Sequence, residues 1–261
     1  MNIKSLFAVS LGAALALSSP RVAASATPAL NPEADRRLLT ACNLLAAAKT
    51  FTVRAEVWED FVSAGHKVSV TRLIDAQVRR PNRLQLEVRS SQDSHGYWYD
   101  GKVLTLLDRV NNLYGSTAAP DNLEKLLDAA RERFGINFPL EDLLVNDPYA
   151  SARAGIKESA YFGQEVILGV PCHHLAFSTP VVDWQIWIQD GERPLPRKLV
   201  ITYKQEETAP QFTAIFSDWK LNSDLPENTF RFEPQPAAAK IEILPVDEVP
   251  ASVPPQTSSH P

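Results

Sequence analysis

The stretch Phe51-Thr52-Val53-Arg54-Ala55-Glu56-Val57-Trp58 places a hydrophobic side chain at every second position. Successive side chains of a β-strand point to opposite faces, so this period of two predicts a strand with one buried face. Ala64-Gly65 then predicts a turn. After the turn the same period continues on one face of a second strand, through Val68, Val70, Ile74, Ala76 and Val78.

The same signature recurs along most of the chain. Asp100-Gly101 between two apolar runs is a strong signal for a tight hairpin. Further strands are expected near residues 84–88, 97–99, 103–107, 112–116, 159–168, 172–178, 183–189, 197–204, 211–220 and 229–232. Strands joined by short turns must be antiparallel, because parallel pairs need long crossover connections. About eleven strands, each with one apolar face, predict a large sheet that curls.

Two helical regions interrupt this pattern. Asn31 is suited to cap a helix that starts at Pro32, and Leu38, Cys42 and Leu45 follow at helical spacing. A second helix is expected at residues 123–134 and a short one at 139–145, where Glu141-Asp142 suit the first turn. These helices are too few to coat both faces of the sheet. We therefore expect a mainly β, α+β fold whose helices cover the concave face.

The first residues predict export. Lys4 precedes the uncharged apolar run Leu6 to Leu17, and Ala24-Ser25-Ala26 is a small-x-small cleavage site. This order is typical of a secretory signal peptide, and we expect a periplasmic location. The predicted domains are the signal peptide at residues 1–26, a single β domain at 27–244, and a disordered proline-rich tail at 245–261.

Charge and hydropathy narrow the range of partners. The chain has 26 basic and 31 acidic residues, and loss of Lys4 and Arg21 with the leader brings its net charge to −7. A protein that binds nucleic acid needs a clustered basic face, so no nucleic-acid partner is expected. No segment of the mature chain is apolar over the roughly 20 residues that a membrane span requires.

The two cysteines leave one question open. Cys42 is expected on the core side of the first helix, and Cys172 on a strand far along the chain. In an oxidising compartment the two can pair if the helix packs on that strand. The alternative is two buried thiols that act as small hydrophobic groups.

Few residues suggest catalysis. His173 and His174 are adjacent on a strand, so they point to opposite faces and cannot share one metal ion without distortion. The chain contains no HExxH, CxxC or GxSxG motif. We therefore expect no catalytic residue, metal or cofactor.

Several longer motifs resemble a known family. They are residues 78–84, 99–102, 169–177, 183–188, 194–201 and 230–234. From Asn31 to Leu244 the chain is similar to a family of predicted periplasmic proteins of unknown function, related to the LolA/LolB-type lipoprotein carriers. The resemblance implies an unclosed, strongly curved antiparallel sheet with helices in its mouth. In the carriers that hollow holds acyl chains.

The leading hypothesis is therefore a binding protein for a lipid, acyl chain or lipidated protein. The alternative is an envelope structural or protein-interaction module with a filled core, and a hydrolase is a third, weaker hypothesis. Residues 121–154 are expected to form either a lid over the hollow or a static plug. The predicted cavity lining is Leu38, Val53, Val57, Leu84, Leu86, Leu126, Trp184, Ile186, Leu199 and Ile201.

Overall fold

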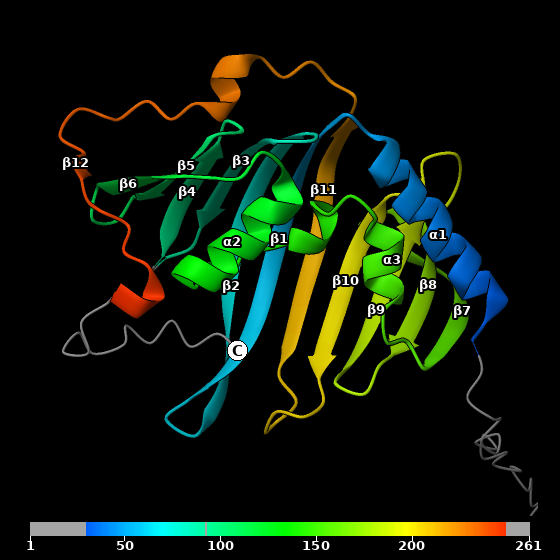
Figure 1. The fold of residues 1–261 in the computed structure, drawn as a ribbon. Helices are drawn as coiled ribbons and strands as arrows, with labels where there is room; N and C mark the ends of the chain where they lie inside the picture. Colours follow the sequence, from blue (N-terminus) through cyan, green and yellow to red (C-terminus); the bar gives the residue numbers. More distant parts are fainter. Residues whose placement is uncertain (1–29, 92, 249–261) are drawn as a thin grey trace, which may run out of the picture.

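The computed structural model describes residues 30–91 and 93–248, so the predicted signal peptide and residues 249–261 lie outside the described residues. One twelve-stranded sheet carries three α-helices on one face (Figure 1). The helices are α1 (Pro32–Ala47), α2 (Leu123–Phe134) and α3 (Pro148–Arg153). The strands are β1 (Thr50–Ser63), β2 (His66–Arg79), β3 (Arg83–Arg89), β4 (Ser94–Tyr99), β5 (Val103–Asp108), β6 (Leu113–Ala118), β7 (Glu158–Ile167), β8 (Val170–Ser178), β9 (Val182–Gln189), β10 (Pro196–Tyr203), β11 (Gln211–Leu221) and β12 (Ala239–Lys240).

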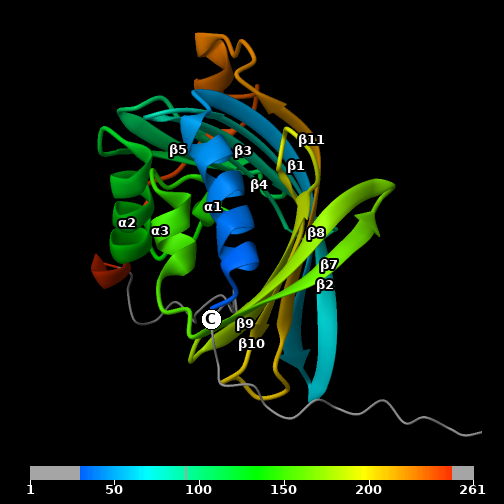
Figure 2. The same ribbon diagram turned by 90° about the vertical axis from the view of Figure 1, so that its right-hand side faces the viewer.

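The sheet consists of two meanders joined side by side. Its strand order is β12-β6-β5-β4-β3-β2-β1-β11-β10-β9-β8-β7, so the pairing of β1 with β11 unites the two halves of the chain. The edge strands β7 and β12 do not pair with each other, and the sheet is therefore open. Figure 2 shows that it is strongly curved and that the helices lie together on its hollow side. The expected fold class is confirmed.

The helix ends follow the local sequence. The Asn31 side chain accepts hydrogen bonds from the backbone N–H groups of Glu33 and Ala34, both at 3.0 Å, and Pro32 begins α1. Asn122 caps α2 in the same way, and α2 ends at Gly135 in the left-handed conformation (φ 65°) that glycine adopts without strain. No helix within the described part of the chain is long and apolar enough to cross a bilayer.

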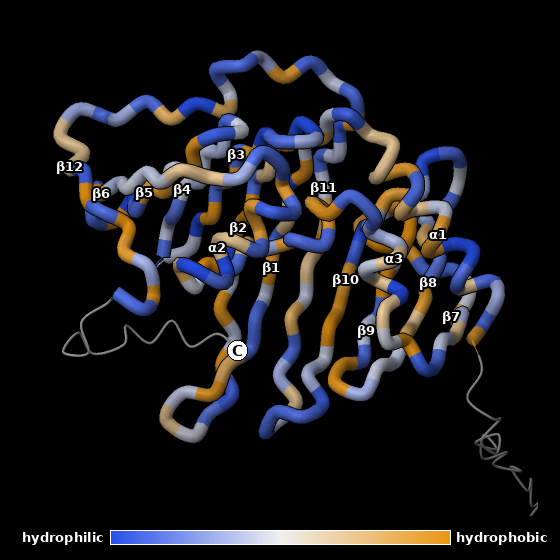
Figure 3. Tube along the Cα trace, in the orientation of Figure 1, coloured by the Kyte–Doolittle hydropathy of each residue, from blue (hydrophilic) through white to orange (hydrophobic). Residues whose placement is uncertain are grey.

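The helices divide the concave face into two regions. Beneath α2, the helix stripe Leu123, Leu126, Leu127 and Ala130 packs on β1 to β5 in a filled core. Beneath α1 and α3, a second cluster joins the α1 stripe to β8 and β9. The apolar run of β10, visible in Figure 3, lies between these two regions.

Three expectations are corrected at the level of single elements. Residues 229–232 form no strand, because Phe230 belongs to the 3-10 turn η2 (Glu227–Phe230). Its side chain is buried, and the Arg79 guanidinium lies 5.1 Å from the centroid of its ring. The helix expected at 139–145 is a single 3-10 turn, η1 (Glu141–Leu143). The sheet is not antiparallel throughout, since β12 pairs in parallel with β6. The chain after β11 crosses one end of the sheet before it reaches that edge (Figure 1).

A candidate apolar ligand pocket beneath α1 and α3

A pocket of about 260 Å³ lies between α1, α3, the turn η1 and strands β9 to β11. Most of its lining is apolar, and its polar side chains are Asp142, Ser151 and Thr179. The lining residues are Leu38, Ala41, Cys42, Leu45, Asp142, Leu143, Pro148, Ser151, Ala152, Ala154, Thr179, Val182, Trp184, Ile186, Pro196, Leu199, Ile201 and Phe216.

The periodicity of each element places its side chains in the pocket. Helical spacing puts Leu38, Cys42 and Leu45 of α1 on the face that looks down on the sheet. Strand alternation aims Trp184 and Ile186 of β9 upward at that face. The result is an apolar ceiling and an apolar floor contributed by segments more than 100 residues apart.

α3 is held to α1 by a polar contact. The Asp35 carboxylate accepts a hydrogen bond at 3.0 Å from the Tyr149 hydroxyl and one at 2.8 Å from Nε of Arg153. Burial, together with the hydrogen bond to Asp35, raises the pKa of the Tyr149 phenol, so this hydroxyl keeps its proton at neutral pH. This contact joins α3 to α1, and α3 forms one wall of the pocket.

A second contact fixes the turn that precedes α3. The Arg80 guanidinium donates hydrogen bonds of 2.9 Å to the backbone carbonyls of Leu143, Leu144 and Val145. Burial lowers the pKa of the Arg80 guanidinium. An arginine nonetheless keeps its charge in proteins. Three carbonyls at the end of η1 thus accept hydrogen bonds from one side chain in the turn that follows β2.

Asp142 is the one charged side chain in the lining. It remains exposed to solvent, yet protein surrounds it closely enough that burial raises the pKa of its carboxyl. The neighbouring carboxylate of Glu141 adds to the increase, and Arg131 partly offsets it. No lysine, arginine or histidine lines the pocket.

The structure separates the residues predicted to line a cavity into two groups. Leu38, Trp184, Ile186, Leu199 and Ile201 line the pocket together. The other five lie in the filled core because α2 covers that half of the concave face. These are Val53, Val57, Leu84, Leu86 and Leu126.

Other lining residues were missed by the sequence analysis. Val182 shares its strand face with Trp184, so alternation extended by one step could have found it. Pro148 and Ala152 belong to a helix too short to show a periodic stripe. No local signal identifies Phe216, because its contribution depends on the pairing of β11 with β10.

The open question about the cysteines is answered. Cys42 and Cys172 are both buried, free thiols. Cys42 lies on the face of the sheet that α1 covers, whereas Cys172 packs with Trp187 and Val200 on the opposite face. The sheet lies between the two side chains, so the bridge does not form.

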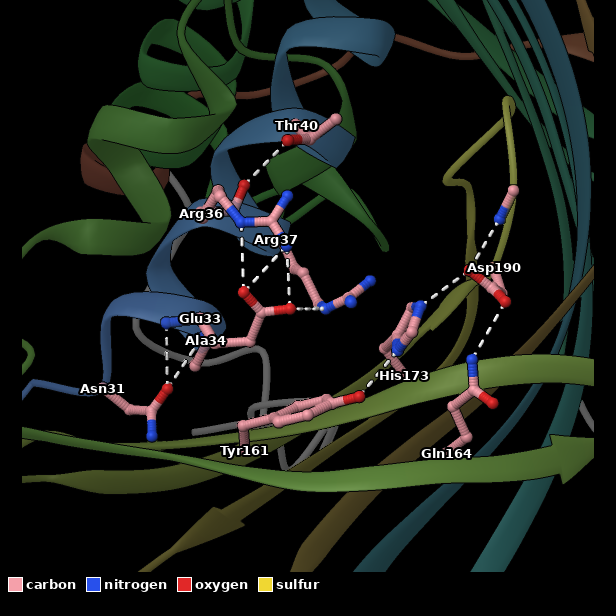
Figure 4. A network of polar contacts seen from close by, with 11 residues as sticks. Asn31, Glu33, Ala34, Arg36, Arg37, Thr40, Tyr161, Gln164, His173 and Asp190 are labelled. Atoms are coloured by element: carbon pink, nitrogen blue, oxygen red, sulfur yellow. Dashed lines mark hydrogen bonds and ion pairs between the residues drawn. The ribbon is translucent and has the colours of Figure 1, made fainter.

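His173 belongs to a polar network near the start of α1, shown in Figure 4. Its Nδ1 lies 2.9 Å from the Tyr161 hydroxyl and its Nε2 lies 2.8 Å from the Asp190 carboxylate. The hydrogen bond with His173 holds the pKa of Asp190 below its usual range. Both ring nitrogens are engaged, so the histidine links β7, β8 and the β9–β10 loop.

The described residues contain no group of three or more His, Cys, Asp or Glu side chains that could hold a metal ion. His174 lies on the other face of β8 from His173 and stacks on Trp187, with ring centroids 4.1 Å apart. The two adjacent histidines therefore have separate packing roles.

The comparisons with known proteins come from sequence and from structure. A family model described as "Predicted periplasmic protein (DUF2092)" matches residues 34–244. Lipoprotein LppX of Mycobacterium tuberculosis is similar in structure, with 14% identity, a TM-score of 0.45, and coverage of 75% of this chain and 98% of that chain. LprF of Mycobacterium bovis is similar in structure with 10% identity and a TM-score of 0.47, over 77% of this chain and 97% of that chain.

A LolA superfamily protein from Nitrosomonas europaea gives 10% identity and a TM-score of 0.39, over 76% of this chain and 97% of that chain. No curated protein matches the sequence. All three TM-scores lie below 0.5, and no ligand or partner is transferred to this chain from them.

Proposed function

This chain belongs to the DUF2092 family of predicted periplasmic proteins, and we propose that it is a non-enzymatic binding protein for an apolar chain. The bound chain would belong to a lipid, a free acyl compound or a lipidated protein. The family confirms both the resemblance suggested by the sequence motifs and the periplasmic location predicted from the leader. We further propose that the mature protein starts after Ala26 and that residues 27–244 form its binding domain.

The observation that carries this proposal is the apolar pocket under α1 and α3. A pocket lined by aliphatic and aromatic side chains, with few polar groups, is the usual form of a small-molecule site. Since a cavity of roughly 150 Å³ accommodates benzene, the pocket of about 260 Å³ has room for roughly ten non-hydrogen atoms. That volume suits one alkyl chain and is too small for several chains at once.

The filled core beneath α2 favours the alternative function. Half of the concave face, including Leu84 and Leu86, is fully buried and offers no space to a ligand. A structural or protein-interaction module of the envelope would need only such a core. The two functions differ in a measurable way, because only the first requires the pocket under α3 to take up an apolar molecule.

A pair of matched variants tests the binding function. Ala152 lines the pocket, whereas Ala150 of the same helix is exposed and is not among the lining residues. We expect the mature protein to bind the small neutral fluorophore 1-naphthylamine, which matches the volume of the pocket. Ala152→Phe should lower its affinity at least about tenfold by filling the space, and Ala150→Phe should leave it unchanged. Equal affinities in the two variants would refute binding at this pocket.

A further inference from the structure

The mouth of the pocket carries a carboxylate without an ion-pair partner. Glu141 is engaged by Arg131, whose Nη2 lies 2.6 Å from its carboxylate. The next residue, Asp142, lines the pocket and makes no hydrogen bond or ion pair with any residue that the structure describes. Arg131 therefore forms its ion pair with Glu141 and acts on Asp142 only through a weaker electrostatic effect, which leaves the Asp142 carboxylate without an ion-pair partner.

Two further carboxylates share an electrostatic neighbour with Asp142. Burial, together with Glu59, Glu206 and Asp142, raises the pKa of the Tyr203 phenol at the end of β10. All three carboxylates therefore lie within electrostatic range of this one phenol. Asp142 is the member of this group that belongs to the lining.

The cations in this region are already paired. Arg72 forms an ion pair with Glu59. Lys204 lies 2.8 Å from the Asp183 carboxylate and donates a hydrogen bond of 2.6 Å to the carbonyl of Thr179, a lining residue. Asp142 is therefore the charged group that the lining itself presents to a ligand, and neither of these two cations forms an ion pair with it.

We propose that the pocket selects its ligand by head-group charge, taking a single alkyl chain that ends in a cation in preference to one that ends in a carboxylate, and that Asp142 sets this preference. The inference rests on the proposed binding function. The apolar ceiling and floor hold the chain, so the polar end of a ligand stays at the mouth, beside Asp142. A carboxylate there would meet a like charge, whereas an ammonium group would meet its counter-ion.

The expected size of the preference follows from Coulomb's law. Two unit charges in contact interact several times more strongly near a protein surface than in bulk water. The Asp142 carboxylate attracts the amine and repels the acid, and both effects contribute to the difference between their affinities. We therefore expect a preference of at least about tenfold for the cationic ligand, with a neutral ligand between the two.

Three ten-carbon probes test the inference in the mature protein at pH 7.5. Decylamine, decanol and decanoate differ only in their polar end, and their affinities are measured by displacement of the small fluorophore 1-naphthylamine. We expect decylamine to bind most tightly and decanoate most weakly. Asp142→Asn should reduce the amine-to-acid ratio to about twofold or less, and Asp142→Glu should restore most of it.

A matched control removes a charge elsewhere. Glu132 is an exposed carboxylate of α2 outside the lining, so Glu132→Gln changes net charge equally and should keep the wild-type ratio. Affinity for neutral decanol in each variant reports whether the pocket is intact. If decanol binds but the wild-type ratio is near one, the charge preference is overturned and the binding function stands. If the ratio persists in Asp142→Asn, its assignment to Asp142 is overturned, and if none of the three probes binds, both proposals fail.

Discussion

The indole of Trp184 stacks on the ring of Phe177, with centroids 4.2 Å apart and planes inclined by 21°. Trp184 comes from β9 and Phe177 from β8, and the two residues are directly paired across these strands. Offset stacking of this kind adds to the gain from burial. The stack therefore fixes the orientation of one side chain in the floor of the pocket.

Removal of this indole should affect both binding and stability. Trp184→Ala takes away part of the pocket floor and the stacking contact, so we expect weaker 1-naphthylamine binding and a loss of about 2 kcal/mol in the free energy of unfolding. Fluorescence titration and urea unfolding measure the two effects. Trp58→Ala is the control, since Trp58 lies outside the lining on β1 and should leave the affinity unchanged. Equal losses of affinity in both variants would contradict the assigned floor.

Arg80 should be essential for the turn before α3. Arg80→Ala leaves three backbone carbonyls without their donor, and we expect it to lower the free energy of unfolding by about 3 kcal/mol. The free energy of unfolding of Arg80→Lys should lie between those of the wild type and Arg80→Ala, because an ammonium group cannot reproduce the planar arrangement of guanidinium donors. Urea unfolding measures both, and Arg133→Ala on the exposed side of α2 should change stability by no more than about 0.5 kcal/mol. An equally small effect of Arg80→Ala would rule out this role.

Amide hydrogen exchange should distinguish a static part of residues 121–154 from a part that opens. The buried stripe of α2 is part of the filled core, so its amides should be protected as strongly as those of β1 and β2. Residues 141–153 contain only one 3-10 turn and one six-residue helix, which close few backbone hydrogen bonds, so they should exchange faster. Decylamine should slow exchange in 141–153 alone. Uniform protection across the whole segment, unchanged by ligand, would show a static plug throughout.

The two thiols should be unreactive in the folded protein. Burial, with a contribution from Asp147, raises the pKa of Cys42 to about 12, and burial also raises the pKa of Cys172. The thiolate is the reactive form, and below these pKa values it is scarce. We expect Ellman's reagent at pH 8 to modify neither cysteine in the native protein and both in guanidinium chloride. Fewer than two reactive thiols after unfolding without reductant would indicate a disulfide and contradict the structure.

The sequence predicted the sheet well because strand alternation is a local signal. Phe51 to Val57 form β1 as expected, and Trp184 and Ile186 share the inward face that their spacing indicated. The errors concern short segments: at Phe230 one buried aromatic side chain resembled the end of a strand, although that segment forms a turn.

The position of the pocket could not be predicted in the same way. Leu84 and Leu199 are both apolar residues on inward faces of strands, and their local sequences do not distinguish them. Leu84 is buried in the core beneath α2, whereas Leu199 lies beside the space between α1 and α3. Only the placement of the helices over the sheet decides which position is filled. Asp142 was likewise expected to stabilise a helix start, and its place in the lining follows from tertiary packing.

The most direct test of the account is a crystal structure of the mature protein with decylamine. We predict one alkyl chain between Leu38 of α1 and Leu199 of β10, with its ammonium group beside the Asp142 carboxylate. The core beneath α2 should be unchanged. An empty pocket at saturating decylamine, or a chain bound at another surface, would contradict the central claim that this pocket is the binding site.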